Sequence, residues 1–233
     1  MLPSPKSATF AASTHLETMK ELLLIVFAYL IGSIPTALLI SRKFFDIDIR
    51  DYGSGNMGAT NTFRVLGSKY GTIVMVCDIL KGMLAVSLYN FLPHYLHNEW
   101  DRTNLMVGLG LSAVLGHVFP IFAQFKGGKG VATLFGMLLA LQPVIAASCV
   151  GVFLLVLFLT RYVSLSSILA GIFLPICVLW IWNDDVVVYR IFAVLVACLI
   201  VLTHQKNIIK ILRGSESRVP ILKHRDRRKA RNK

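Results

Sequence analysis

The chain has 233 residues and a formal net charge of +12; 55% of its residues are hydrophobic and only 15% are charged. With a mean hydropathy of +0.67 it is too apolar for a soluble domain, and several apolar runs approach or exceed the roughly 20 residues that cross a bilayer. We therefore expect an all-α polytopic membrane protein that is surrounded by membrane lipid and has no nucleic-acid partner.

The first residues differ from the rest of the chain. Met1–Thr18 is polar, contains two prolines and lacks the apolar core of a signal peptide. Met19-Lys20-Glu21, followed by the first apolar run at Leu22, is typical of a translation start. We therefore interpret residues 1–18 as a disordered leader or a mis-assigned start, residues 19–216 as the membrane domain, and residues 217–233 as a basic cytoplasmic tail. Lys223–Lys233 is expected to bind anionic lipid headgroups or to solvate the terminus.

The apolar segments and the basic residues between them predict about seven membrane crossings. Val131–Thr160 is longer than one ordinary span but short for two, with Pro143 near its middle. Lysine and arginine accumulate in cytoplasmic loops, and Arg161 joins the other basic segments only if this stretch is a hairpin bent at Pro143. The alternative arrangement has five crossings and places Thr160 outside. The expected crossings are Leu22–Ser41, Gly71–Leu92, Leu105–Phe122, two short helices within Val131–Thr160, Tyr162–Trp182 and Val186–Thr203, with the amino terminus outside and the carboxyl terminus cytoplasmic.

The polar loop Arg42–Lys69 follows the first expected crossing and contains a glycine-rich stretch that ends at Arg64. Small hydroxyls, amides and backbone N–H groups supply neutral hydrogen-bond donors, and the arginine adds a planar charge for bidentate contacts. A glycine-rich loop alone is weak evidence, but this density of donors beside a membrane favours a binding site. The donors belong to Ser54, Gly55, Asn56, Thr60 and Asn61.

A second glycine-rich turn, Lys126-Gly-Gly-Lys-Gly130, joins two apolar segments. Lys126 and Lys129 place cationic side chains where backbone N–H groups can approach a ligand closely, which suits a phosphate. The turn is not a P-loop, because Gly130 follows Lys129 where that motif has Ser or Thr. Taken by itself, it is more simply interpreted as a short basic turn between membrane helices.

Three pairs of polar residues stand three positions apart and therefore share a helix face: Asp78 and Lys81, Ser164 and Ser167, and His204 and Asn207. The first pair lies inside an expected crossing, where ionisable groups are costly, so it predicts a structural ion pair or a support for the site. The serines predict either two hydroxyls facing one pocket or a helix cap. The third pair falls at the cytoplasmic boundary. All the donor-rich segments thus share one side, which predicts a cationic pocket for one or two phosphate groups.

The chain resembles the bacterial acyl-phosphate-dependent glycerol-3-phosphate acyltransferases, the PlsY family, over about residues 19–216. The resemblance rests on three signature motifs: Gly53-Ser-Gly-Asn-x-Gly-Ala-Thr-Asn-x-x-Arg64, Gly116-His-x-Phe-Pro-x-Phe-x-x-Phe-Lys-Gly-Gly-Lys-Gly-Val-Ala-Thr133 and His204-x-x-Asn-Ile…Gly-x-Glu216. One position departs from the family, which usually has Arg after the third-motif histidine. Here that residue is Gln205, so a guanidinium near the site is missing.

The resemblance implies transfer of a fatty acyl group from acyl phosphate to the 1-hydroxyl of glycerol 3-phosphate, giving lysophosphatidate and inorganic phosphate. It places this first step of phospholipid synthesis in the bacterial cytoplasmic (inner) membrane and leaves room for contact with the enzyme that makes acyl phosphate. It implies catalytic roles for His204, Asn207, Lys129, Arg64 and Ser54. It implies substrate-binding roles for Gly55, Asn56, Thr60, Asn61, His117, Lys126, Gly127, Gly128, Ser164 and Ser167.

The proton acceptor is open between His204 and an oxygen of a substrate phosphate. We favour the phosphate, because a pocket full of cations lowers the pKa of His204. We expect no cofactor and no metal; the four cysteines are scattered without Cys-x-x-Cys spacing and give no disulfide or metal signal. A small permease for an organic phosphate is the alternative function. Against it, the polar groups cluster at one membrane face, and the sequence has no convincing inverted repeat.

Overall fold

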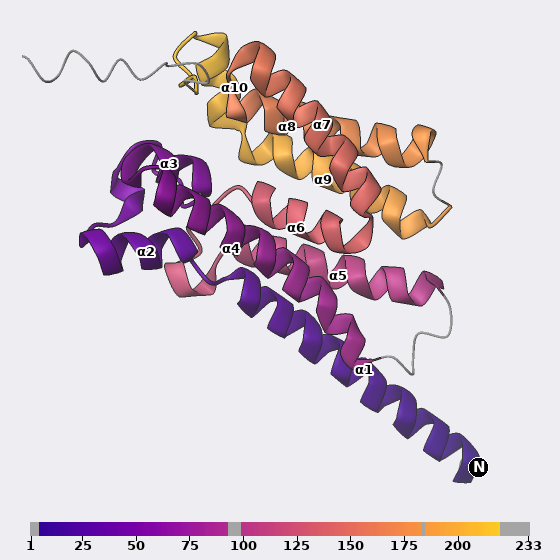
Figure 1. Ribbon diagram of the computed structural model, residues 1–233. Coiled ribbons are helices and arrows are strands. Elements are labelled where there is room, and N and C mark those ends of the chain that lie inside the picture. The colour runs from indigo at the N-terminus through magenta and orange to yellow at the C-terminus, as the bar shows by residue number, and fades with distance from the viewer. Residues whose placement is uncertain (1–4, 93–98, 183–184, 220–233) are drawn as a thin grey trace, which may run out of the picture.

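The computed structural model describes residues 5–92, 99–182 and 185–219, and within these ranges all regular secondary structure is helical (Figure 1). The main helices are α1 (Pro5–Gly32), α2 (Thr36–Phe45), α3 (Ala59–Leu66), α4 (Ser68–Ser87), α5 (Glu99–Val118), α6 (Val131–Leu141), α7 (Pro143–Thr160), α8 (Val163–Ile176), α9 (Val187–Thr203) and α10 (Gln205–Leu212). Most of the basic tail, including Lys223–Lys233, lies outside the described residues.

Five described segments are long and apolar enough to cross a membrane: Thr18–Phe45, Ser68–Phe91, Asp101–Ala123, Pro143–Thr160 and Val163–Ile181. The count rises to six if α9 and α10, which are bent by 59° relative to each other, are taken together as one span. The expected class, an all-α polytopic membrane protein, is confirmed. α6 has 11 residues and is about 16 Å long, well short of the roughly 30 Å hydrocarbon layer. The count of seven crossings therefore stays a prediction.

α6 and α7 form a bent hairpin with only Gln142 between them. Lys129, just before α6, and Ser164, at the start of α8, both belong to one hydrogen-bonded cluster with Asn207, so the chain leaves and returns to the same end of the bundle. Figure 1 shows α7 running back towards the end of the bundle at which α6 starts. Pro143 opens α7 at a position where a missing N–H costs nothing, which explains the bend.

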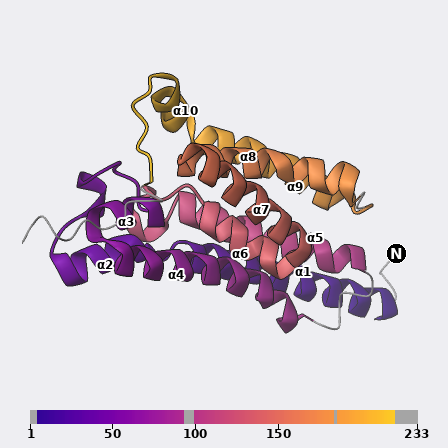
Figure 2. The ribbon, with the colours of Figure 1, turned by 45° about the horizontal axis from the view of Figure 1, so that its top comes forward.

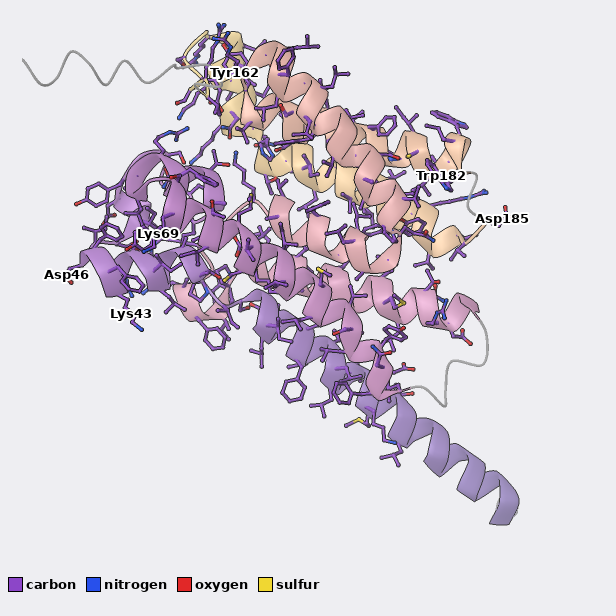
Figure 3. All side chains as sticks on the ribbon, in the orientation of Figure 1. Lys43, Asp46, Lys69, Tyr162, Trp182 and Asp185 are labelled. Carbon is purple, nitrogen blue, oxygen red and sulfur yellow. The ribbon has the colours of Figure 1, made fainter. Side chains whose placement is uncertain are left out.

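The two ends of the bundle differ in their residues. Figure 3 shows Lys43 and Lys69 at the end that carries α2 and α3, and Trp182 and Asp185 at the opposite end. α1 begins at the second end, near the label N in Figure 1. This distribution agrees with the expected cytoplasmic position of the basic loops; the orientation in the membrane stays a prediction.

The first helix departs from the sequence expectation in two ways. It begins at Pro5, so most of the segment expected to be a disordered leader is helical; residues 1–4 lie outside the described part. Between Pro5 and Gly32 there is no glycine or proline to interrupt the helix, and proline is tolerated at its first position. The helix also ends at Gly32, and α2 starts only after Pro35. A Cβ on Gly32 would lie 2.0 Å from the carbonyl oxygen of Ala113, so the glycine allows α1 and α5 to pack closely.

The helices form two packed groups. α7, α8 and α9 lie over α5 and α6, while α1 and α4 cover the other side (Figures 1 and 2). The largest buried apolar cluster joins the groups and includes Val114, Met137, Leu174 and Phe192, all at most 1% exposed. This apolar core fixes the helix ends that carry the candidate site.

Candidate active site

Four polar side chains from distant segments form one cluster, which we call the hub: Lys129, Ser164, Asn207 and Glu216. Lys129 Nζ donates to Asn207 Oδ1 at 2.5 Å, and Asn207 Nδ2 donates to Glu216 Oε1 at 2.7 Å. Ser164 Oγ donates to the same carboxylate oxygen at 2.7 Å. The hub thus ties the glycine-lysine turn to α8, α10 and the segment after α10.

Lys129 carries a positive charge that its neighbours only partly offset. Burial lowers the pKa of Lys129 to about 8; Glu216 acts in the opposite direction, and Lys210 and Arg64 lower the pKa further. The influence of Arg64 means that α3 brings its guanidinium towards the hub, where its exposed side chain makes no hydrogen bond among the described residues. Two further cations and one carboxylate thus act on Lys129, and this excess of positive charge favours an added anion.

His204 is buried directly beyond the end of α9, with 2% of its surface exposed. Its Nδ1 lies 2.8 Å from the carbonyl oxygen of Ile200, which can only accept, so Nδ1 carries the proton and Nε2 keeps its lone pair. Burial first, and the charge of Lys129 second, lower the pKa of His204 to about 4. At neutral pH the imidazole is therefore uncharged and offers one acceptor nitrogen. Gln205, the departure from the family pattern, is exposed beside it.

The glycine-rich stretch between α2 and α3 is organised by Asn61, which is 2% exposed. Asn61 Oδ1 accepts the N–H of Ser54 at 2.8 Å, and its Nδ2 donates to the Tyr52 carbonyl at 3.0 Å. Gly53 has φ +62°, and a Cβ there would lie 2.3 Å from Asn61 Oδ1, so only glycine fits. The amide therefore shapes the loop, leaving Ser54 and Thr60 exposed. Asn56 also acts locally, accepting the N–H of Gly58 at 2.9 Å.

An open cleft of about 450 Å³ lies between this stretch and the glycine-lysine turn. Arg50 holds its wall: the guanidinium is 2.6 Å from Asp48 Oδ2 and donates to the Ala123 carbonyl at 3.3 Å. The hydrogen bond from Arg50 keeps the pKa of Asp48 well below its ordinary value, so this ion pair persists into acid. The lining residues are Asp48, Arg50, Asp51, Gly55, Gln124, Lys126 and Gly127.

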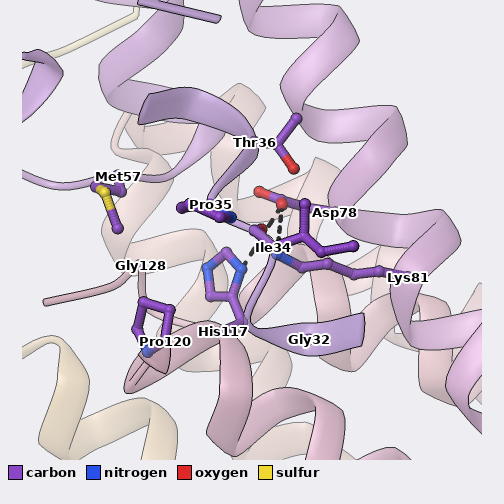
Figure 4. Close-up of a pocket in the computed structure, with 10 residues that line it drawn as sticks. All are labelled: Gly32, Ile34, Pro35, Thr36, Met57, Asp78, Lys81, His117, Pro120 and Gly128. Carbon is purple, nitrogen blue, oxygen red and sulfur yellow. Dashed lines mark hydrogen bonds and ion pairs between the residues drawn. The ribbon is translucent and has the colours of Figure 1, made fainter. Parts of the chain in front are cut away.

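A buried charged cluster supports the turn from the membrane side (Figure 4). Lys81 Nζ lies 2.8 Å from Asp78 Oδ1, and His117 Nδ1 lies 3.6 Å from the same oxygen. The predicted ion pair of Asp78 and Lys81 is therefore present. Gly128 packs on His117: its N–H donates to the His117 carbonyl at 3.1 Å, and a Cβ would lie 2.0 Å from His117 Nε2. His117 is thus placed under the turn, in contact with Asp78 rather than with a hub residue.

The structure separates residues that the sequence groups together. Ser164 faces the hub, but Ser167 donates to the carbonyl of Val163 within its own helix at 2.9 Å. Neither serine caps α8, since the capping position is Tyr162. Gly127 has no room for a side chain because a Cβ would lie 2.0 Å from the His117 carbonyl oxygen. Close packing thus accounts for Gly127 and Gly128 as glycines.

Sequence reasoning missed Glu216 as a site residue and missed the pair of Asp48 and Arg50. Glu216 stands in the third motif, and its position four residues past α10 gave no periodic signal. Asp48 and Arg50 belong to none of the three motifs. Only in the folded chain does Glu216 reach Ser164 and Asn207. Likewise, only folding brings Arg50 to the carbonyl of Ala123.

The chain is similar to proteins of known family and structure. The family model described as glycerol-3-phosphate acyltransferase matches residues 22–214. Glycerol-3-phosphate acyltransferase 2 of Bacillus anthracis is 46% identical over 199 residues, covering 85% of this chain and 99% of the relative. The crystal structure of PlsY, an integral membrane glycerol 3-phosphate acyltransferase, in its glycerol 3-phosphate form has a TM-score of 0.76, 38% identity, and covers 86% of this chain and 96% of its own. The lysophosphatidic acid form of the same enzyme has a TM-score of 0.73 and 38% identity, and the match covers 85% of this chain and 95% of that one.

Proposed function

The chain belongs to the glycerol-3-phosphate acyltransferase family, and from this premise we propose that it acylates the 1-hydroxyl of glycerol 3-phosphate with a fatty acyl phosphate. The hydroxyl oxygen forms a bond to the acyl carbonyl carbon, and the bond from that carbon to the phosphate oxygen breaks. The products are lysophosphatidate and inorganic phosphate, and the hydroxyl proton passes to a base. An acyl phosphate is a mixed anhydride, so the protein has to bind and orient rather than activate the donor.

The observation that carries this proposal is the cationic surround of the hub. Both substrates have phosphate groups, and Arg64 and Lys210 are each close enough to Lys129 to lower its pKa. Lys129 supplies a point charge and Arg64 a planar fork for phosphate oxygens. Preorganised cations of this kind also stabilise charge that develops on the leaving phosphate. Ser54, Thr60 and Lys126, which are exposed at the same end, supply further donors.

His204 and Asn207 lie against the position proposed for glycerol 3-phosphate. The uncharged imidazole presents Nε2 as a hydrogen-bond acceptor for the attacking hydroxyl. A pKa of about 4 makes His204 a weak base near neutral pH, so we infer that an oxygen of a substrate phosphate takes the proton while His204 orients the hydroxyl. The acyl chain stays in the surrounding lipid. The proposed location is the bacterial cytoplasmic membrane. The hub lies on its cytoplasmic side, where it can take up glycerol 3-phosphate from the aqueous phase.

The test is a reconstitution with defined substrates. Purified protein in lipid nanodiscs is given palmitoyl phosphate and glycerol 3-phosphate, without acyl-CoA or acyl carrier protein, and lysophosphatidate and phosphate are measured. Equal amounts of both products are expected. Turnover with acyl-CoA but not with acyl phosphate would contradict the proposed donor. Uptake of glycerol 3-phosphate into sealed vesicles without any acylation would favour the permease.

A further inference from the structure

The segment Gly214–Val219, which we call the strap, follows α10 and folds back over the start of α8. Its first turn is sharp, because Gly214 has φ +66° and ends the helix in a left-handed conformation. The N–H of Glu216 then donates back to the carbonyl of Lys210 at 3.2 Å. This turn fixes the near end of the strap against α10.

The far end of the strap is fixed to the turn between α7 and α8. Val219 N–H donates to the carbonyl of Arg161 at 2.9 Å. Arg218 Nε donates to the hydroxyl of Tyr162 at 3.0 Å, and the guanidinium carbon lies 4.9 Å from the centre of the Tyr162 ring. Figure 3 labels Tyr162 beside α10 and the strap. Arg218 therefore contacts Tyr162 in two ways, through a cation–π contact with the ring face and a hydrogen bond to the hydroxyl.

Glu216 lies between these two attachments and is the only strap residue in the hub. Its carboxylate accepts from Ser164 and Asn207, and Asn207 accepts from Lys129. The position of Glu216, and hence the orientation of Asn207 and Lys129, depends on the strap. The match to the family model ends at residue 214, the first residue of the strap.

We propose that Arg218 is a positioning residue: by gripping Tyr162 it holds the strap so that Glu216 orients Lys129 and Asn207 towards the substrate phosphate. The proposal rests on the proposed acyl transfer for its effect on catalysis. Its effect on the hub itself can be measured without turnover.

The charged groups that face Lys129 give the proposal a signature that a general loss of stability would not produce. Glu216 raises the pKa of Lys129, whereas Lys210 and Arg64 lower it, and His204 lies within electrostatic reach. When the Arg218 contact is lost, the strap loosens and Glu216 withdraws. The pKa of Lys129 then falls, because the lowering influences remain and the raising one weakens.

The experiment titrates Lys129 by NMR in full-length protein with labelled lysine, after assignment with Lys129→Arg. In Arg218→Ala we expect the pKa of Lys129 to fall towards its value in Glu216→Gln. The KM for glycerol 3-phosphate should rise roughly threefold to tenfold with a smaller change in kcat, since one orienting contact is lost. Arg218→Lys keeps a cation over the ring and should recover part of both effects.

Arg213→Ala is the matched control: it removes the same charge from an exposed side chain that makes no hydrogen bond among the described residues. It should leave the pKa of Lys129 and the KM unchanged. If Arg218→Ala does not fold, Tyr162→Phe removes only the bonded hydroxyl and is expected to shift the pKa in the same direction. An unshifted pKa of Lys129 in the folded variant would overturn the proposal. A shifted pKa in a protein that does not acylate glycerol 3-phosphate would refute the proposed function instead.

Discussion

Lys129 donates to Asn207 at 2.5 Å across 78 residues of sequence, and this bond joins the two motifs that bear the strongest candidate residues. The ammonium group sits in a turn before α6, and the amide on the first turn of α10. Asn207 Nδ2 donates to Glu216. Because the amide of Asn207 is uncharged, it orients Lys129 without neutralising it. The cation thus keeps most of its charge for a ligand.

Removing Lys129 should therefore impair catalysis without unfolding the protein. Lys129→Ala loses a charge-assisted hydrogen bond to phosphate, which is worth about 1.5–3 kcal/mol, or roughly tenfold to more than a hundredfold in kcat/KM. Lys43→Ala, an exposed lysine at the same end, is the matched control and should behave like the unaltered protein. The measurement is kcat/KM for both substrates. Full activity in Lys129→Ala would remove the centre of the proposed site.

The pH dependence of the reaction should report the same lysine. Lys129 is charged below its pKa of about 8, so phosphate contact is retained at lower pH and lost as pH rises through that value. We expect kcat/KM for glycerol 3-phosphate to fall on the alkaline side near pH 8. Lys129→Arg, which stays charged, should move this fall to higher pH even if its rate is lower. If the alkaline fall of kcat/KM stays near pH 8 in Lys129→Arg, a group other than Lys129 is responsible for it.

Much of the fold and part of the site follow from the sequence, for physical reasons. Apolar runs of about 20 residues dictate membrane helices, and Arg161 with Pro143 correctly indicated the bent hairpin. The i, i+3 pairs were less informative. Helical spacing states that two side chains share a face and leaves open what that face meets, so Ser164 reaches Glu216 while Ser167 bonds its own helix.

Polar residues in loops were the hardest to assign, because a donor can bind a ligand or the chain's own backbone. Asn61 looks like a ligand-binding amide, yet all its hydrogen bonds hold the loop together. His117 and Gly128 belong to the same signature motif and look like phosphate-binding residues, but they pack on each other. The sequence indicated where the site lies, and only the folded loops separate the residues that can bind from those that support.

The packing of Gly128 leads to a prediction about the turn. Gly128→Ala would place a Cβ 2.0 Å from His117 Nε2, so the turn or the buried histidine has to move. We expect a loss of activity of at least roughly tenfold and a lower melting temperature, consistent with overpacking costs of about 1–3 kcal/mol. The control is Gly151→Ala on α7, where a Cβ meets nothing within 4 Å. Equal behaviour of the two variants would mean that the turn tolerates displacement.

The hairpin gives a prediction about membrane topology. In a cysteine-free background, a single cysteine replacing Gln142 should react with an impermeant reagent added outside, whereas one replacing Thr160 should react only from the cytoplasmic side. The reason is that α6 leaves the basic end of the bundle and α7 returns to it. Labelling of Thr160→Cys from outside would contradict the seven-crossing arrangement and favour five crossings.

The last prediction concerns the base. His204 is uncharged, donates from Nδ1 to Ile200, and has a pKa of about 4, so it is suited to orient a hydroxyl rather than to take its proton. His204→Ala should therefore keep measurable turnover, with a rise in KM for glycerol 3-phosphate. His204→Gln, whose side chain can accept the same hydrogen bond, should retain more activity than His204→Ala. Steady-state kinetics of the two variants, with binding of glycerol 3-phosphate measured by calorimetry, separate the roles. If both variants bind glycerol 3-phosphate normally but show no turnover, His204 is the base and the substrate phosphate is not.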